Sequence, residues 1–219
     1  MNFRQKHTIF DTRGSYYFSH LSIRPLPRLP DRPHRGLLAM GSLAIPCAIG
    51  WDGIAPKRRE GDGRTPTGQF TIIEWRRRKD IWAIFRPDCR TIKRADGWCD
   101  DPASNSYNRP VTLPFRAGAE NLWRDDGVYD AIGILDFNFS PRVRDRGSAI
   151  FIHLAHDDCR TTAGCIALRR STMRKIQFLW SAKVKVRIGF SIAFRKLPSP
   201  PGPTSLRVEW PTRNRRSCP

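Results

Sequence analysis

The sequence has no apolar run that could span a bilayer, which takes about 20 such residues. Its longest apolar stretch, residues 37–50, is shorter and is broken by glycine and proline. The first 20 residues also contain no run of about 7–15 apolar residues, so no secretory signal is visible. We therefore expect no transmembrane segment. The 39% of hydrophobic residues still suffices for a buried core, which excludes a wholly disordered chain.

Acidic residues are scarce, since 20 Asp and Glu stand against 39 Lys and Arg and give a formal net charge of +19. A basic chain attracts polyanions, which suggests nucleic acid as a partner. The charge is concentrated at the ends, however. Residues 1–35 hold seven basic and two acidic residues and residues 191–219 hold six and one, so each flank carries +5. The middle of the chain is only moderately basic, and we expect no specific nucleic-acid partner.

The same flanks hold ten of the 18 prolines. Proline removes a backbone donor and disfavours helices and central strands. A length of 219 residues suits one domain with extensions. We therefore predict a loosely ordered basic extension over residues 1–20, a folded domain over 21–190 and a Pro/Arg-rich tail over 191–219.

The six cysteines follow no regular spacing, and no Cys-x-x-Cys pair occurs, which argues against a zinc ribbon. Histidine is scarce too, because residues 36–190 contain only His153 and His156. A metal site that combines them with Cys159 and Cys165 is an alternative, since imidazole and thiolate suit zinc. Residues 153 and 156 would point to opposite faces of a strand unless it ended between them. We predict no metal and no cofactor.

Strand signals dominate the central segment, and only one stretch favours a helix. A two-residue turn at Gly41-Ser42 predicts a hairpin. A helix capped by Ser171 is expected to run through Leu179. Residues 89–127 are rich in turn residues, and we expect them to form an ordered insertion over a cleft. Further strands are predicted at 69–73, 81–85, 129–135, 148–155 and 183–188. The fold is therefore predicted to be mainly β, with a helix packed on or beside the sheets.

His153 and Cys165 are the central residues best suited to covalent chemistry. His153 lies on the most hydrophobic predicted strand, and a loop-like segment allows Cys165, twelve residues later, to fold back against it. A nucleophilic cysteine needs a base or cation that favours its thiolate. Gly164 permits close approach of the backbone, whose N–H groups could meet an oxyanion. Spacing alone does not separate such a pair from a histidine and a cysteine that merely pack in a core.

The residues around this pair resemble a known family. The strand 148–153 and the following Thr162-Ala163-Gly164-Cys165-Ile166-Ala167-Leu168 are similar to the signature of the L,D-transpeptidase catalytic-domain family (YkuD-like). That signature is a strand His followed by Ser/Thr-x-Gly-Cys-Ile/Val, and one bacterial branch continues with Ala-Leu. The resemblance covers about residues 21–190. It also includes residues 57–70, 98–102, 107–109, 122–126 and 129–130.

This resemblance implies a β-sandwich or barrel of mixed sheets with one or two helices, acting on peptidoglycan stem peptides. In the family's scheme Cys165 attacks the amide after the meso-diaminopimelate residue of a tetrapeptide and expels D-alanine, while His153 acts as general base. The carbonyl of Leu154 would orient the second ring nitrogen. We group Leu154, Gly164 and Thr162 as orienting or oxyanion-binding residues. The thioester then passes to an amine acceptor, which can belong to a wall-linked protein, or to water.

Two positions depart from the family pattern. Ala163 replaces a common His before the Gly, and Ala167 replaces a common Arg after Cys-Ile. The second change leaves recognition of the substrate carboxylate open, and we predict Arg109 and Asn138 as substrate-binding residues. The family implies the bacterial periplasm or cell envelope as location. Crosslinking (3–3), L,D-carboxypeptidase action and attachment or release of a wall protein all stay open, as do a basic nucleic-acid-binding module and a wall-binding domain with an inert cysteine.

Overall fold

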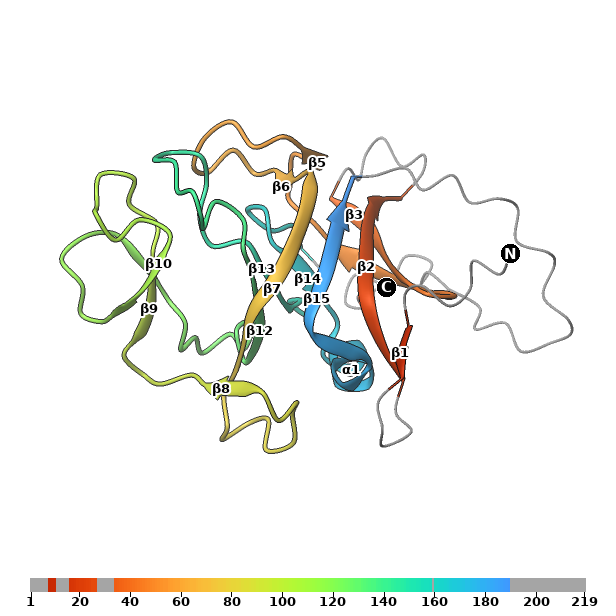
Figure 1. Cartoon of the computed structure of the whole chain (residues 1–219). Coiled ribbons are helices and arrows are strands. Elements are labelled where there is room, and N and C mark those ends of the chain that lie inside the picture. The colour runs from red at the N-terminus through yellow and green to blue at the C-terminus, as the bar shows by residue number, and fades with distance from the viewer. Residues whose placement is uncertain (1–7, 11–15, 27–33, 159, 190–219) are drawn as a thin grey trace, which may run out of the picture.

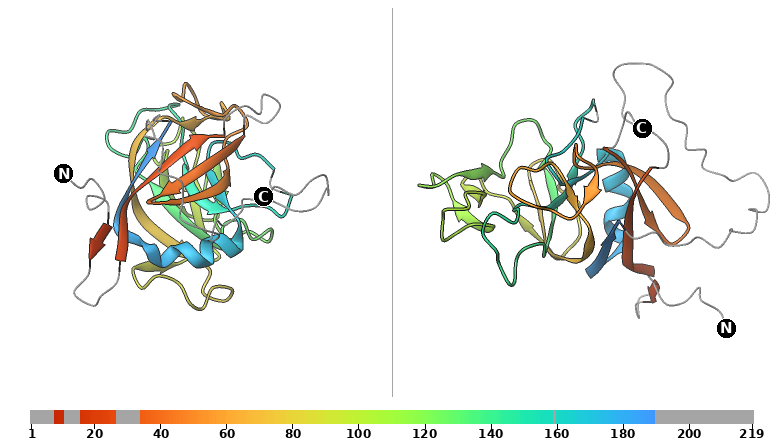
Figure 2. Two further views of the ribbon diagram at one scale, coloured as in Figure 1. Left: turned by 90° about the vertical axis from the view of Figure 1, so that its right-hand side faces the viewer. Right: turned by 90° about the horizontal axis from the view of Figure 1, so that it is seen from above.

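Figure 1 shows the computed structural model of the protein, which describes residues 8–10, 16–26, 34–158 and 160–189. The main sheet closes on itself. Eight strands follow one another around the circuit, and pairing of β2 with β3 closes it. In order they are β2 (Tyr16–Pro25), β15 (Trp180–Ile188), β7 (Gly68–Arg77), β12 (Ala131–Leu135), β13 (Phe151–Leu154), β14 (Ile166–Leu168), β4 (Leu43–Ala48) and β3 (Arg35–Met40). The left view of Figure 2 shows these strands curving into a ring.

The sheet is mixed, because β2 with β15 and β13 with β14 are parallel pairs, whereas the other pairs of the circuit are antiparallel. Two short strands are added outside the circuit, β1 (Thr8–Phe10) on β2 and β8 (Cys89–Thr91) on β7. Two small sheets complete the fold. They are β10 (Arg109–Thr112), β9 (Asp96–Cys99) and β11 (Ala119–Asn121), and β5 (Ile54–Ala55) with β6 (Thr65–Pro66). The prediction of a mainly β barrel of mixed sheets is confirmed.

All eight strands of the circuit contribute to one apolar cluster, which therefore fills the barrel. Strand β15 illustrates the pattern, since Val184, Val186 and Ile188 are buried in this cluster. A second cluster lies on the other face of β12 and β13, where Ile134 and Phe151 pack with Trp98 and Leu122. The segment predicted as an insertion thus covers the outside of these two strands. Strands β12 and β13 are buried on both faces, as continuous apolar sequence requires.

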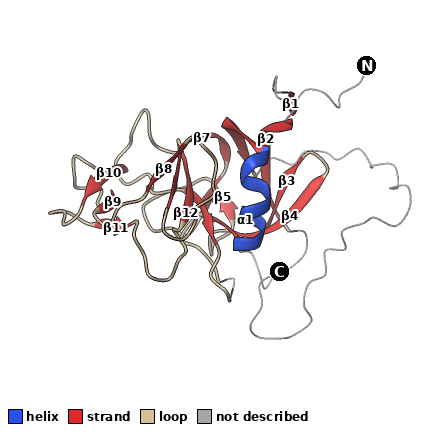
Figure 3. Cartoon of the chain, turned by 90° about the horizontal axis from the view of Figure 1, so that it is seen from below, coloured by secondary structure: helices blue, strands red, loops and turns tan. Residues whose placement is uncertain are grey.

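The helix α1 (Arg170–Ile176) lies at one end of the barrel, as Figures 1 and 3 show from two directions. Met173 and Ile176 face the barrel cluster. The helix begins two residues earlier than predicted, with Arg169 at the N-cap and no side-chain cap, so Ser171 does not cap it. It continues as a 3₁₀ turn, η2 (Gln177–Leu179), to the residue expected. No helix in the described ranges is long and apolar enough to cross a membrane.

The hairpin around Gly41-Ser42 is confirmed by the pairing of Met40 with Leu43. The strand predicted at 81–85 is wrong, because these residues form turns and bends. Trp82 and Phe85 are buried and pack edge to face at 5.5 Å, while Ile84 is 79% exposed. The guanidinium of Arg77 donates to the carbonyl oxygens of Trp82 and Ala83. These are oxygens that would accept hydrogen bonds from a partner strand if the segment were a strand.

Strand residues also occur within the predicted extension. Residues 8–10 form β1 and residues 16–20 form the first half of β2, so the span 1–20 is not loose throughout. The reason is that β2 pairs with both β15 and β3 and belongs to the barrel wall. The division between the extension and the domain stays a prediction, as does the tail over 191–219, which lies outside the described residues.

Candidate active site

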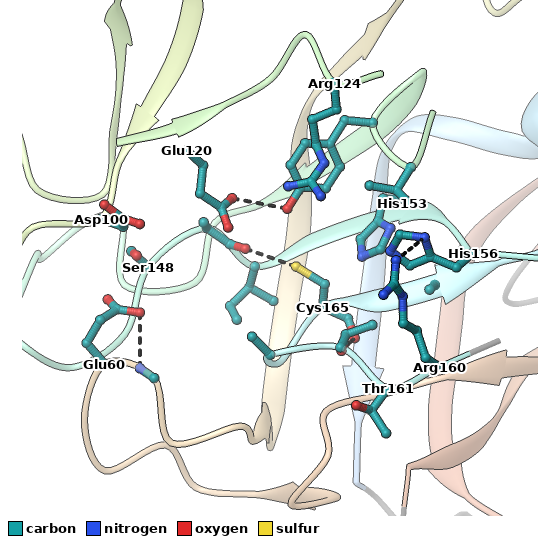
Figure 4. Close-up of a pocket in the computed structure, with 18 of the residues that line it drawn as sticks. Glu60, Asp100, Glu120, Arg124, Ser148, His153, His156, Arg160, Thr161 and Cys165 are labelled. Atoms are coloured by element: carbon teal, nitrogen blue, oxygen red, sulfur yellow. Dashed lines mark hydrogen bonds between the residues drawn. The ribbon is translucent and has the colours of Figure 1, made fainter. Parts of the chain in front are cut away.

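The register of two parallel strands brings His153 and Cys165 to the same face of the sheet. His153 of β13 is paired with Ala167 of β14. Cys165 precedes Ala167 by two residues, and side chains two apart in a strand share a face. Both side chains line one pocket, with a cavity volume of about 380 Å³ (Figure 4). The fold therefore builds from two neighbouring strands the pair that the sequence suggested.

The imidazole of His153 is held as a neutral base. Its Nδ1 lies 2.8 Å from the carbonyl oxygen of Leu154, which can only accept a hydrogen bond, so the ring proton sits on Nδ1 and Nε2 keeps its lone pair. Burial lowers the pKa of His153 to about 4. The ring also packs edge to face on Tyr129, with centroids 5.3 Å apart. Leu154 thus has the orienting contact that the resemblance implied.

The thiol of Cys165 is neutral and is hydrogen-bonded to backbone groups of the protein. Its Sγ donates to the carbonyl oxygen of Ala149 at 3.0 Å and accepts from the N–H of Phe151 at 3.3 Å. Burial raises the pKa of Cys165 to about 12, and the charge of Glu120 adds to the rise. A cation that favours the thiolate is present in Lys57, whose charge lowers the pKa of Cys165. This effect is smaller than the rise caused by burial and by Glu120. The pair in this structure is therefore a thiol and an imidazole, with no ions.

A buried amide that the sequence analysis missed supports the sulfur. Asn108 is 2% exposed, and its Oδ1 accepts from Trp98 Nε1 at 3.0 Å and from the N–H of Ala149 at 3.1 Å. Its Nδ2 donates to the carbonyl oxygens of Phe137 and Asn138. Asn108 therefore holds Ala149, the residue whose carbonyl oxygen receives the Cys165 thiol. The only sequence signal was its place in the family-like segment 107–109.

The loop before Cys165 is closed by Thr162. The Thr162 hydroxyl donates to the carbonyl oxygen of Cys165 at 2.6 Å and accepts from the N–H of Gly164 at 3.2 Å. Thr162 therefore has an orienting position. The N–H of Gly164 is used inside the loop in this structure, so it would have to leave Thr162 before it could bind a substrate oxygen.

Replacing Gly164 with alanine is expected to distort this loop. Gly164 has a φ of +142°, and an added Cβ would stand 2.7 Å from the carbonyl oxygen of Arg64. We expect a loss of about 1–3 kcal/mol in unfolding free energy, measured by denaturant titration, and a clear fall in Cys165 acylation. Gly61→Ala is the matched control, because it also has positive φ but meets no atom within 4 Å. Equal losses in the two variants would contradict the close-contact argument.

Carboxylates form one side of the pocket, as Figure 4 shows for Glu60, Asp100 and Glu120. The Tyr129 hydroxyl donates to Glu120 Oε2 at 3.0 Å, and the Tyr107 hydroxyl donates to Glu60 Oε2 at 2.5 Å. Burial, together with the charges of Asp100 and Glu60, raises the pKa of Glu120. None of these carboxylates was singled out from the sequence, because Glu60 and Asp100 come from separate loops and Glu120 from strand β11, and only the fold brings them together.

Cations and the second histidine form the other side of the pocket. Arg124 pairs with Asp126 at 2.5 Å, and Arg160 donates to His156 Nδ1 at 2.9 Å. His156 faces the pocket together with His153 because β13 ends at Leu154, between the two. No group of three or more His, Cys, Asp or Glu side chains within the described residues could hold a metal ion. Cys159, which the alternative zinc site required, lies outside the described residues.

The two predicted substrate-binding residues do not line the pocket. The guanidinium of Arg109 donates to the carbonyl oxygens of Asn108 and Phe139 and stacks over the Phe139 ring. The side chain of Asn138 bonds the backbone of Val143 and Gly147. Both residues stabilise a neighbouring loop. Substrate binding by these two residues stays a prediction, and the arginines that line the pocket are Arg124 and Arg160.

The comparison with known proteins agrees with the geometry. Residues 35–188 match the family model described as YkuD, L,D-transpeptidase catalytic domain. The matched range contains seven of the eight barrel strands, all but β2, together with the whole pocket. No curated protein matches the chain.

Proposed function

The chain belongs to the L,D-transpeptidase catalytic-domain family, which acts on peptidoglycan stem peptides, and we propose that it transfers an acyl group from such peptides through a thioester on Cys165. The observation that carries the proposal is the neutral His153, its proton held on Nδ1 by Leu154, on the same sheet face as Cys165. We propose that the reaction takes place in the cell envelope, where this substrate lies.

In the first half of the proposed reaction, the Cys165 sulfur attacks the carbonyl carbon of the scissile amide while its proton passes to His153 Nε2. The tetrahedral intermediate collapses as His153 returns this proton to the departing D-alanine nitrogen. A thioester and a free amino acid result, and His153 is neutral again. The proton transfer must accompany the attack, because the surroundings of Cys165 disfavour a preformed thiolate.

In the second half, an acceptor amine or a water molecule attacks the thioester carbonyl. His153 takes the proton that the nucleophile loses and returns it to the departing Cys165 sulfur. An amine acceptor gives a crosslink or an attached protein, and water gives a trimmed tripeptide. The charged side chains on the pocket walls select between these outcomes, because they determine which acceptor binds beside the thioester.

The test is digestion of purified sacculi with the protein, followed by mass analysis of the muropeptides. New 3–3 crosslinks would establish transpeptidation, and loss of the fourth residue alone would establish carboxypeptidase action. Unchanged muropeptides, together with no acylation of Cys165 by a soluble tetrapeptide, would refute the proposal.

A further inference from the structure

The pocket beside Cys165 is divided by charge, with carboxylates on one side and arginines on the other (Figure 4). We propose that the acidic side, formed by Glu60, Asp100, Glu120 and Ser148, is a binding site for the ammonium group of a substrate amine. This inference rests on the proposed function and deepens it, because it names the chemical group that the pocket selects. That ammonium can belong to the acyl donor or to the acyl acceptor.

The three carboxylates have no cationic partner in the part of the chain that is described. No ion pair joins Glu60, Asp100 or Glu120 to another described residue. The cations nearest in the pocket are already engaged, since Lys57 pairs with Asp62 at 2.8 Å and Arg124 pairs with Asp126. A partly buried group of like charges costs free energy unless a counter-charge binds. The charge of Arg124 acts on Glu120, but its guanidinium is paired with Asp126, so a ligand cation would supply the missing counter-charge.

Ser148 gives a second and independent indication of a ligand. Its side chain is buried, with 5% exposure, and its Oγ has no hydrogen-bond partner. It lines the pocket on the side of Asp100 and Glu60 (Figure 4). A buried hydroxyl without a partner is costly, and native proteins rarely leave one. An ammonium group has three donors, which match a hydroxyl oxygen and two carboxylates better than a neutral or anionic group does.

The acidic side also lies within electrostatic reach of the reacting sulfur. The charges of Glu120 and Glu60 both act on the Cys165 thiol. The hydroxyl of Tyr129 links Glu120 to the ring that packs on His153. An amine held by these groups would therefore lie beside the thioester. Binding its ammonium there would also neutralise the charges that disfavour development of negative charge on the sulfur.

The test compares donors and acceptors with and without the positive charge. In the donor arm, acylation of Cys165 is timed by intact mass with a tetrapeptide whose third residue has a free side-chain amine and with its N-acetylated counterpart. In the acceptor arm, the preformed acyl-enzyme reacts with increasing concentrations of an amine peptide, which gives the half-saturating concentration. We expect the parent protein to prefer the free amine about tenfold in the donor arm or to saturate with the amine in the acceptor arm.

The variants are Glu120→Gln and the double variant Asp100→Asn/Glu120→Gln, and the control is Asp125→Asn, an exposed carboxylate outside the pocket lining. The pocket variants should lose the donor preference or raise the half-saturating acceptor concentration about tenfold, and the affected arm identifies the source of the ammonium. Acylation by a β-lactam without an amine should proceed at the parent rate in Asp125→Asn and should not fall in the pocket variants, because the charge of Glu120 raises the pKa of Cys165. Acylation of the parent with no response to charge in either arm overturns this inference alone. A parent that no donor acylates overturns the proposed function and this inference together.

Discussion

Replacing Cys165 with alanine is expected to abolish formation of the covalent adduct with a tetrapeptide or a carbapenem. Among the described residues that line the pocket, no other side chain carries a thiol, and removal of a nucleophile lowers turnover by at least about a thousandfold. Intact-mass spectrometry checks this directly, because the parent gains the mass of the tetrapeptide without D-alanine, or the whole mass of the carbapenem, whose ring opens without releasing a leaving group. The variant should gain nothing over the same time.

The alanine variant is also expected to fold. The thiol makes one hydrogen bond to Ala149 and receives one from Phe151, and their loss should cost about 1–2 kcal/mol of unfolding free energy. Cys89→Ala is the matched control, since burial raises the pKa of Cys89 to about 12 as well, yet Cys89 lies on β8, outside the pocket lining. If Cys165→Ala still gained the adduct mass and Cys89→Ala did not, the assignment of the nucleophile would be wrong.

The sequence predicts the reacting pair better than it predicts the rest of the pocket. His153 stands on β13 and Cys165 directly precedes β14, both segments with strong apolar signals, and the periodicity of extended chain then predicts one face for the two side chains. The turn at Thr162 and Gly164 likewise depends on hydrogen bonds between neighbouring residues. Such features depend on contacts within a few residues, and the composition of the segment determines them.

The pocket walls could not be predicted in the same way. Glu60 and Asp100 lie in two loops and Glu120 lies on β11. The packing of residues 92–129 on β12 and β13 brings Asp100 and Glu120 to the pocket, and the Tyr107 hydroxyl binds Glu60 there. Arg109 was chosen because it is an arginine in a family-like segment, but its guanidinium binds two backbone carbonyl oxygens in its own neighbourhood. Residue type alone does not say which arginine faces a substrate.

The +19 charge is the feature that the structure explains least. Much of it belongs to residues 1–35 and 191–219, most of which lie outside the described residues. The pocket lining is not uniformly basic, because carboxylates and arginines both contribute to it. The site therefore selects by local charge, and the net charge of the chain supports only encounter with an anionic polymer.

Replacing His153 with glutamine is expected to lower the rate of Cys165 acylation by about 10²–10⁴-fold. The glutamine side chain cannot take the thiol proton, and the high pKa of Cys165 leaves almost no thiolate at neutral pH to react without a base. Single-turnover acylation followed by intact mass measures the rate. His156→Gln tests the other pocket histidine, and a larger loss in that variant than in His153→Gln would move the base to His156.

The pH dependence of the parent protein provides a further check on the same residue. The base form of His153 is the neutral ring, and its pKa of about 4 means that this form is lost only as the pH falls through about 4. The acylation rate should therefore change little between pH 8 and pH 5.5. Measuring several donors corrects for the titration of the substrate itself.

A preformed thiolate–imidazolium pair would behave differently, because its cysteine would react rapidly with iodoacetamide at pH 7. Cys165 should instead be alkylated slowly at pH 7 and faster only at strongly alkaline pH. Rapid alkylation at neutral pH would show that the thiol ionises before substrate binds, which would contradict the coupled proton transfer derived from its surroundings.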